Sequence, residues 1–134
     1  MDFERRRDWR AQLIAYLTEV QGQPFTWGTL DCALFACGAV RAQTGVDMAK
    51  GWRGYRTAKG SLRKLRAAGF ANVEEAAAAV LPRAARLRPG DIAVIDTDEG
   101  PALGVVQGRF VYAMTYENGL QAVPMAADQR GFTV

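Results

Sequence analysis

The segment that decides the fold reads Pro24-Phe25-Thr26-Trp27-Gly28-Thr29-Leu30-Asp31-Cys32-Ala33-Leu34-Phe35. Asp31 is a suitable N-cap, so we predict a helix that begins at Asp31 or Cys32 and runs to about Gln43, with Gly45 as its C-terminal stop. Small residues recur along this helix and permit the close approach of a neighbouring element. We therefore expect it to be the central, buried helix of the domain.

Three more helices are expected in the first part of the chain. A stripe of apolar residues at helical spacing predicts the first, from about Asp8 to Gln21; its members are Trp9, Leu13, Tyr16, Leu17 and Val20. The next helix, at about 58–68, is expected to turn Leu62 and Leu65 inward. The last is expected to run from Asn72 to Pro82 with Val80 on its apolar face, because Asn72 and Glu75 have the spacing of a capping box.

The sequence pattern changes from Gly90 onward. Short apolar runs predict strands at 92–95, 102–106, 109–114 and 120–123, with an acidic turn at 96–100 and a possible edge strand at 132–134. Asn118-Gly119 is a hairpin signal. Helices over about 8–82 followed by an antiparallel meander over about 90–134 indicate an α+β fold. The length of 134 residues suits one domain, spanning 1–134.

Composition and charge argue against several classes of protein. No apolar run approaches the roughly 20 residues of a membrane span, and no signal-peptide pattern follows the N-terminus, so we expect synthesis in the cytoplasm. Residues 1–88 carry 15 Lys and Arg against eight Asp and Glu. Aromatics do not interleave with these basic residues, so nucleic-acid binding is not expected. Cys32 and Cys37 lie five positions apart on a helix, which disfavours a disulfide. No metal site or cofactor is expected either.

The motifs resemble those of the NlpC-type peptidoglycan endopeptidases, a branch of the papain-like cysteine peptidases. That family places its nucleophile in an aromatic-x-Trp-Gly-x-x-Asp-Cys motif, which matches residues 25–32 here. Its first core strand opens with Pro-Gly-Asp, here Pro89-Gly90-Asp91, and a Gly-punctuated strand pair follows, here 102–106 and 110–113. The resemblance implies a papain-like, NlpC-type fold with N-terminal helices packed on a C-terminal antiparallel sheet.

The chain departs from this family where the chemistry is done. Cys32 matches the nucleophile, but the position of the catalytic histidine is Ala102 and that of the histidine-orienting residue is Tyr112. The chain contains no histidine at all. Attack on an amide needs a base for the thiol and a proton for the leaving amine. We therefore expect a pseudoenzyme in which Cys32 is vestigial.

Domains of this type without the histidine resemble a family of unknown function in phage genomes, encoded among tail-tip and baseplate proteins. The resemblance implies a structural or assembly component of the virion, made in the host cytoplasm, whose partners are other tail proteins. Peptidoglycan is a further candidate partner. We expect Trp27, Asp31, Trp52 and Tyr55 to contribute to binding, although Asp31 and Trp27 also suit structural roles, and Trp52 and Tyr55 suit packing over the core.

Three alternatives remain open at this stage. The first is a module that binds peptidoglycan without cutting it. The second is an active cell-wall hydrolase or acyl transferase that uses Cys32 with an unusual base, or with a histidine from a partner. Nucleic-acid binding is the weakest, and rests only on the basic half of the chain.

Overall fold

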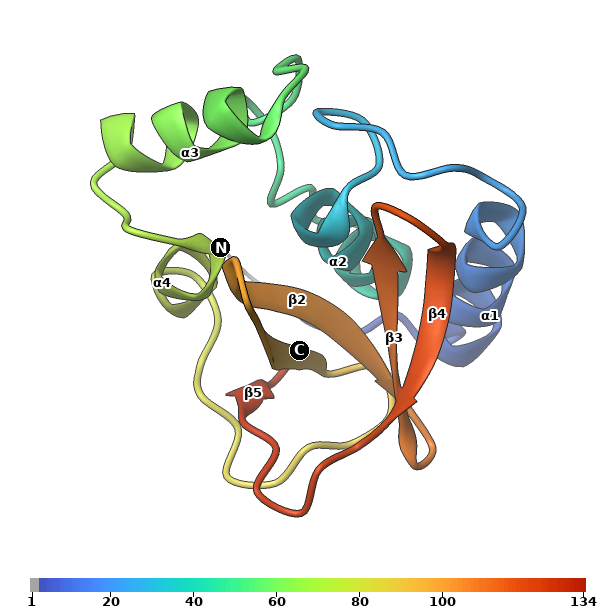
Figure 1. The fold of residues 1–134 in the computed structure, drawn as a ribbon. Helices are drawn as coiled ribbons and strands as arrows, with labels where there is room; N and C mark the ends of the chain where they lie inside the picture. The colour runs from blue at the N-terminus through green and yellow to red at the C-terminus, as the bar shows by residue number, and fades with distance from the viewer. Residues whose placement is uncertain (1–2) are drawn as a thin grey trace.

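A computed structural model describes residues 3–134. Four helices come first and five strands follow (Figure 1). The helices are α1 (Trp9–Val20), α2 (Cys32–Thr44), α3 (Ala58–Ala67) and α4 (Val73–Ala78); the strands are β1 (Ile92–Thr97), β2 (Gly100–Gln107), β3 (Phe110–Thr115), β4 (Gly119–Pro124) and β5 (Gly131–Phe132). The strands form one antiparallel sheet in the order β4-β3-β2-β1-β5. The predicted α+β class is confirmed.

Helix α2 is the central helix, as its small residues predict. Its middle is fully buried at Phe35, Ala36, Ala39 and Val40. Gly38 faces α1, where a Cβ would lie 2.1 Å from the Tyr16 hydroxyl oxygen. That hydroxyl donates a hydrogen bond to the Phe35 carbonyl at 2.8 Å. A residue larger than glycine at position 38 would therefore separate α1 from α2.

Helices α1 and α2 pack against one face of the sheet. The main hydrophobic core joins residues of these helices to alternate residues of the strands, including Ile92, Val94, Leu103 and Val105. The intervening strand residues Ala93, Val106 and Val111 form a second, smaller cluster on the other face. This alternation follows from the period of two in a strand. Both faces of β1 and β2 are thus covered.

Helix α4 ends earlier than predicted. It stops at Ala78, and Val80 is 38% exposed, so the expectation of a helix to Pro82 is wrong. Pro82 disfavours helical backbone in the residue before it, and α4 ends in a turn ahead of it. The predicted cap is confirmed, since the Asn72 side chain accepts a hydrogen bond from the Glu75 amide at 3.0 Å.

Helix α3 stands farther from the sheet than the other helices, above α4 in Figure 1. Leu65 is its buried residue, whereas Leu62 is 37% exposed. The expectation that both leucines face inward is therefore right for Leu65 and wrong for Leu62, because no layer of the protein covers that flank.

The strands also extend beyond their predicted bounds. Strand β1 continues to Thr97 and β2 begins at Gly100, so the expected acidic turn at 96–100 is shortened to the two residues between them. The predicted edge strand is present, but it is Gly131–Phe132 instead of 132–134. Phe132 is completely buried against the main core, which explains why the chain pairs with β1 at that point.

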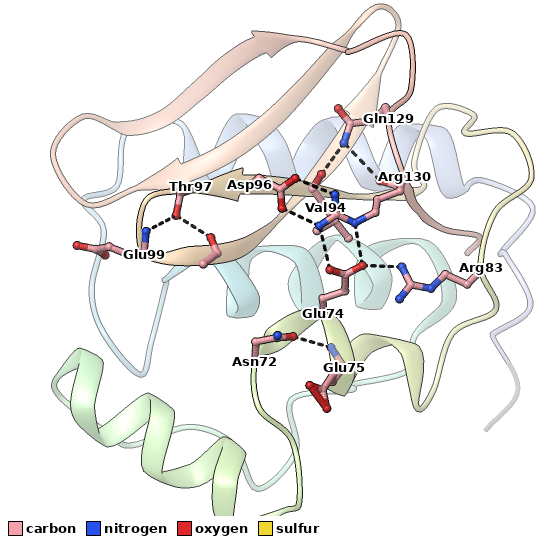
Figure 2. A network of polar contacts seen from close by, with 11 residues as sticks. Asn72, Glu74, Glu75, Arg83, Val94, Asp96, Thr97, Glu99, Gln129 and Arg130 are labelled. Atoms are coloured by element: carbon pink, nitrogen blue, oxygen red, sulfur yellow. Dashed lines mark hydrogen bonds and ion pairs between the residues drawn. The ribbon is translucent and has the colours of Figure 1, made fainter.

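An ion-pair network fastens α4 to the sheet (Figure 2). The Arg130 guanidinium bonds to both oxygens of Glu74 and both oxygens of Asp96. Arg83 adds a second cation, 2.7 Å from Glu74 Oε2. The network joins a short helix, the end of β1 and the segment before β5. None of the described helices has the length and apolar character needed to cross a membrane.

Candidate functional site

Asp31 is the hub of the motif at residues 25–32. Its carboxylate is 1% exposed and accepts three hydrogen bonds. Oδ1 accepts from the Leu34 amide at 3.0 Å, which caps α2. Oδ2 accepts from the Gly28 amide at 3.1 Å and from the Tyr55 hydroxyl. The predicted N-cap is confirmed, and the carboxylate holds two loops as well as the helix.

The Trp27-Gly28 loop and the Gly54-Tyr55 loop are packed backbone to backbone. Gly28 has a φ of +75°, and a Cβ there would lie 1.8 Å from the Tyr55 carbonyl oxygen. The Gly54 amide donates to the Gly28 carbonyl at 3.2 Å. Glycine is needed at position 28 for both its conformation and its lack of a side chain. Asp31 and Tyr55, two of the predicted binding residues, are thus in contact, and their hydrogen bond joins the Gly54-Tyr55 loop to the start of α2.

The Pro89-Gly90-Asp91 motif forms a second hub. Asp91 is 2% exposed and accepts from the Arg88 amide at 2.8 Å, the Val134 amide at 3.0 Å and Arg5 Nη2 at 3.4 Å. It therefore ties the start of β1 to both ends of the described chain.

Gln43, at the end of α2, completes this hub. It is fully buried, and its Nε2 donates to the Gly90 carbonyl at 2.8 Å while its Oε1 accepts from Arg5 Nε at 2.9 Å. Asp31, Gln43 and Asp91 are the buried polar side chains of residues 3–134, and all three are used to join elements.

Cys32 lies at the first position of α2 and is partly exposed. Burial raises the pKa of its thiol, and the neighbouring Asp31 carboxylate raises it further. Backbone hydrogen bonds, foremost one with Leu103, act in the opposite direction but do not prevail. The helix N-terminus alone would favour the thiolate. In this surrounding the neutral thiol is favoured instead, which is the opposite of an activated nucleophile.

The positions aligned with the family's histidine and orienting residue do not share a face of the sheet. Ala102 pairs with Ile95, whose side chain packs on the second cluster, whereas the adjacent Leu103 belongs to the main core. Tyr112 packs against the main core, and its side chain lines a cavity beside α1. The structure brings Cys32 to the backbone of Leu103, and it does not bring Ala102 and Tyr112 together.

The other two aromatic residues singled out in the sequence lie in different places. Trp27 contacts Phe25 edge to face at 4.8 Å, and both rings contact Tyr116 at the β3–β4 turn. Tyr116 is 71% exposed, so this aromatic cluster reaches the surface. Trp52 is half buried and stacks on Phe70 at a ring distance of 6.4 Å. Trp52 thus packs between its own loop and the segment that follows α3.

An apolar cavity of about 410 Å³ lies between α2, α3 and α4, and the sequence patterns do not predict it. We call it the α2–α3–α4 groove. Its lining is mostly apolar and includes Leu34, Met48, Trp52, Leu65, Phe70, Val73, Ala76 and Leu103. Cys37 also lines it, and burial raises the pKa of this thiol to about 12. The sequence carries no local signal of this cavity, because its lining comes from residues between 33 and 103.

Cys32 and Cys37 are free thiols, in agreement with the prediction of no mutual disulfide. Within residues 3–134, no group of three or more His, Cys, Asp and Glu side chains is arranged to hold a metal ion.

The comparisons with known proteins identify a family without assigning it an activity. A family model described as a domain of unknown function, DUF6950, matches residues 4–134. Since that match covers nearly the whole chain, the chain belongs to this family. A search of curated proteins found no match.

Proposed function

We propose that this DUF6950 domain is a non-catalytic relative of the NlpC-type peptidases that acts as a structural or assembly component of a phage tail tip or baseplate. The observation that carries the non-catalytic part is the surrounding of Cys32. Its thiol has a raised pKa, and the carboxylate beside it, Asp31, already accepts three hydrogen bonds. A buried carboxylate held in this way is poorly placed to accept a proton from the thiol.

The chain also lacks the residue that usually serves as the base of a cysteine peptidase. No imidazole exists in the chain to take the thiol proton or to protonate a leaving amine. Loss of one member of a catalytic triad typically lowers the rate by several orders of magnitude. The motif residues that remain have structural roles in the two hubs, which supports retention of the fold for a purpose other than hydrolysis.

The papain-like fold and the tail-tip setting rest on the motif resemblance. The order of elements supports the former, since the Asp31–Cys32 helix start and the Pro89-Gly90-Asp91 strand start fall where the resemblance requires them. A chain of this kind would act through its surface, and its partners would be other tail proteins.

Two measurements test this function. Wild-type protein and Cys32→Ala are compared on gels containing purified peptidoglycan, and we expect no clearing from either. Clearing by the wild type that is lost in Cys32→Ala would refute the non-catalytic proposal. Co-expression with the proteins encoded beside this chain, followed by affinity purification, is expected to recover a stable complex. A chain that stays monomeric and binds none of them would refute the assembly role.

Peptidoglycan binding without cleavage is a second candidate, favoured by the surface cluster of Phe25, Trp27 and Tyr116. All three rings offer apolar contact area, and Trp27 and Tyr116 each add a polar group that can form a hydrogen bond. Sedimentation with purified cell wall tests it. Retention that falls severalfold in Tyr116→Ala would support this candidate, and no retention of the wild type would remove it.

A further inference from the structure

The α2–α3–α4 groove has the size and lining of a binding site. Its volume of about 410 Å³ lies within the usual range for ligand pockets, roughly 300–1,000 Å³. Its walls come from three helices and from the loop that carries Trp52. The carboxylates of both hubs, Asp31 and Asp91, lie outside its lining, whereas Leu34 and Tyr55, which donate to Asp31, contribute to it.

Helix α3 forms one wall and is lightly attached to the rest of the protein. Its anchors include the buried Leu65, the Trp52–Phe70 stack, a side-chain hydrogen bond between Ser61 and Tyr55, and a hydrogen bond from Lys64 to the Gly51 carbonyl at 3.0 Å. A glycine turn lies on each side of it, with Gly54 at a φ of +101° and Gly69 at +92°. The apolar side of α3 therefore has too few contacts with the protein to fill the groove.

The wall of the groove has a net positive charge. Lys50 lines it directly and is exposed. The segment 47–80, which supplies most of the lining, carries seven basic residues and three acidic ones, and two of the acidic ones, Asp47 and Glu74, are held in ion pairs. Asp47, at the edge of the lining, is already paired with Arg53 at 2.9 Å. An occupant with several carboxylates beside an apolar face would complement this surface.

The described residues offer little to a small polar headgroup. No buried side-chain nitrogen or oxygen of residues 3–134 is without a hydrogen-bond partner. A small-molecule site normally presents a few polar groups that point into an apolar pocket. Here the net positive charge is spread along the segment 47–80 instead. That distribution favours an extended acidic partner over a single carboxylate such as that of a fatty acid.

We propose that the α2–α3–α4 groove binds an acidic amphipathic helix of a partner protein, with apolar side chains in the groove and carboxylates against its basic wall. This is the helix-in-groove mode of peptide recognition. The inference rests on the proposed assembly role for the statement that the partner is a protein, and it names the surface and the chemistry of that contact.

The test uses a synthetic amphipathic peptide of about 16 residues with leucines on one face and glutamates beside them, long enough to form a marginal helix. A second peptide has the same leucines and lysines in place of the glutamates. Fluorescence anisotropy of each labelled peptide is measured against the full chain. We expect saturable binding of the acidic peptide, with the basic peptide at least about tenfold weaker.

Variants of the chain locate the binding. Ala76→Trp fills the groove, and Lys50→Glu reverses the charge of the lysine that lines it; each is expected to weaken binding of the acidic peptide about tenfold. Arg86→Glu makes the same change in net charge elsewhere on the surface and is expected to have no effect. Circular dichroism checks folding, and Ala79→Trp is the second groove-filling variant if Ala76→Trp does not fold.

The proposal is overturned by equal binding of both peptides, by binding that groove-filling leaves unchanged, or by no binding of the acidic peptide. Palmitate that binds the groove and excludes the acidic peptide would also overturn it, in favour of a lipid. These results are separate from those for the assembly role. Failure of the peptide tests alongside a stable complex with tail proteins would reject this groove and leave the assembly role standing.

Discussion

Replacement of Asp31 by alanine is predicted to be among the most damaging single changes in the chain. The carboxylate is 1% exposed and has three donors, which the substitution leaves without an acceptor. Loss of the N-cap at Leu34 costs about 1 kcal/mol. The buried Gly28 amide costs a further ~1–2 kcal/mol when unpaired, and the loss of the Tyr55 bond adds about 1 kcal/mol.

The expected sum is roughly 3–4 kcal/mol, against a total stability of about 5–15 kcal/mol for a typical domain. For a chain of this length about 1 kcal/mol shifts Tm by roughly 3–4 °C, so Tm should fall by about 10–15 °C. Urea unfolding followed by circular dichroism gives the free energy directly. Asp128→Ala is the control, because Asp128 is exposed, and it should change stability by less than about 0.5 kcal/mol.

A double-mutant cycle with Tyr55→Phe tests the hydrogen bond between Tyr55 and Asp31. Tyr55→Phe alone should cost about 1–2 kcal/mol, since it removes one donor from a buried carboxylate. In the Asp31→Ala background the same change should cost little, because its partner is already gone. A cost below about 1 kcal/mol for Asp31→Ala, or additive costs in the cycle, would refute the structural role assigned to this carboxylate.

Three further predictions concern individual contacts. Burial raises the Cys37 pKa to about 12 from its ordinary 9.0, so its stabilising contribution is complete below pH 9 and is lost as pH rises toward 12; Cys37 should lower the unfolding free energy by about 1.4 kcal/mol per pH unit in that window, and Cys37→Ala should reduce the slope by that amount in urea titrations at several pH values, while Cys32, Tyr16 and Tyr55, whose pKa values are also raised, keep their share. Gly28→Ala should cost at least ~2 kcal/mol because its Cβ meets backbone, whereas Gly51→Ala, with a similar positive φ but open space around it, should cost only about 1 kcal/mol in the same assay. Arg130 holds the Glu74 pKa below its ordinary 4.5, so the pair stabilises the protein fully above pH 4.5 and progressively less as pH falls. The unfolding free energy of Arg130→Met should therefore depend less on pH below 4.5 than that of the wild type. The same pH dependence in both proteins would contradict the contact.

Most of the fold could be predicted from local patterns. The start of α2 at Cys32 follows from a single capping aspartate, and its end from Gly45, which adopts a φ of +80°. These features depend on a few adjacent residues, so the sequence contains all the information needed. The end of α4 and the exposure of Leu62 depend on which other elements pack beside them in the folded protein. Those contacts involve residues far apart in the sequence, so no local pattern contains them.

The candidate site was harder to predict for the same reason. The bond between Asp31 and Tyr55 joins residues 24 positions apart, and no local pattern announces it. The α2–α3–α4 groove is lined by residues from 33 to 103, so it becomes visible only after folding. The basic residues of the first half of the chain give a net charge from the sequence alone, whereas their position relative to an apolar cavity depends on the tertiary fold.

The two hubs give the motif that resembles an active site a structural role that does not depend on catalysis. Asp31 and Asp91 each lie next to a landmark of the peptidase pattern, and each is buried with three hydrogen-bond donors. Removal of either would leave several buried donors unpaired, at a cost comparable to much of the stability of a domain. Selection for folding alone would therefore retain Asp31 and Asp91. A histidine at position 102 or 112 has no such structural role, so its absence is compatible with an intact fold. It follows that the Trp-Gly-x-x-Asp-Cys and Pro-Gly-Asp motifs indicate how this chain folds, and that evidence for catalysis must come from the imidazole positions, where this chain has Ala102 and Tyr112.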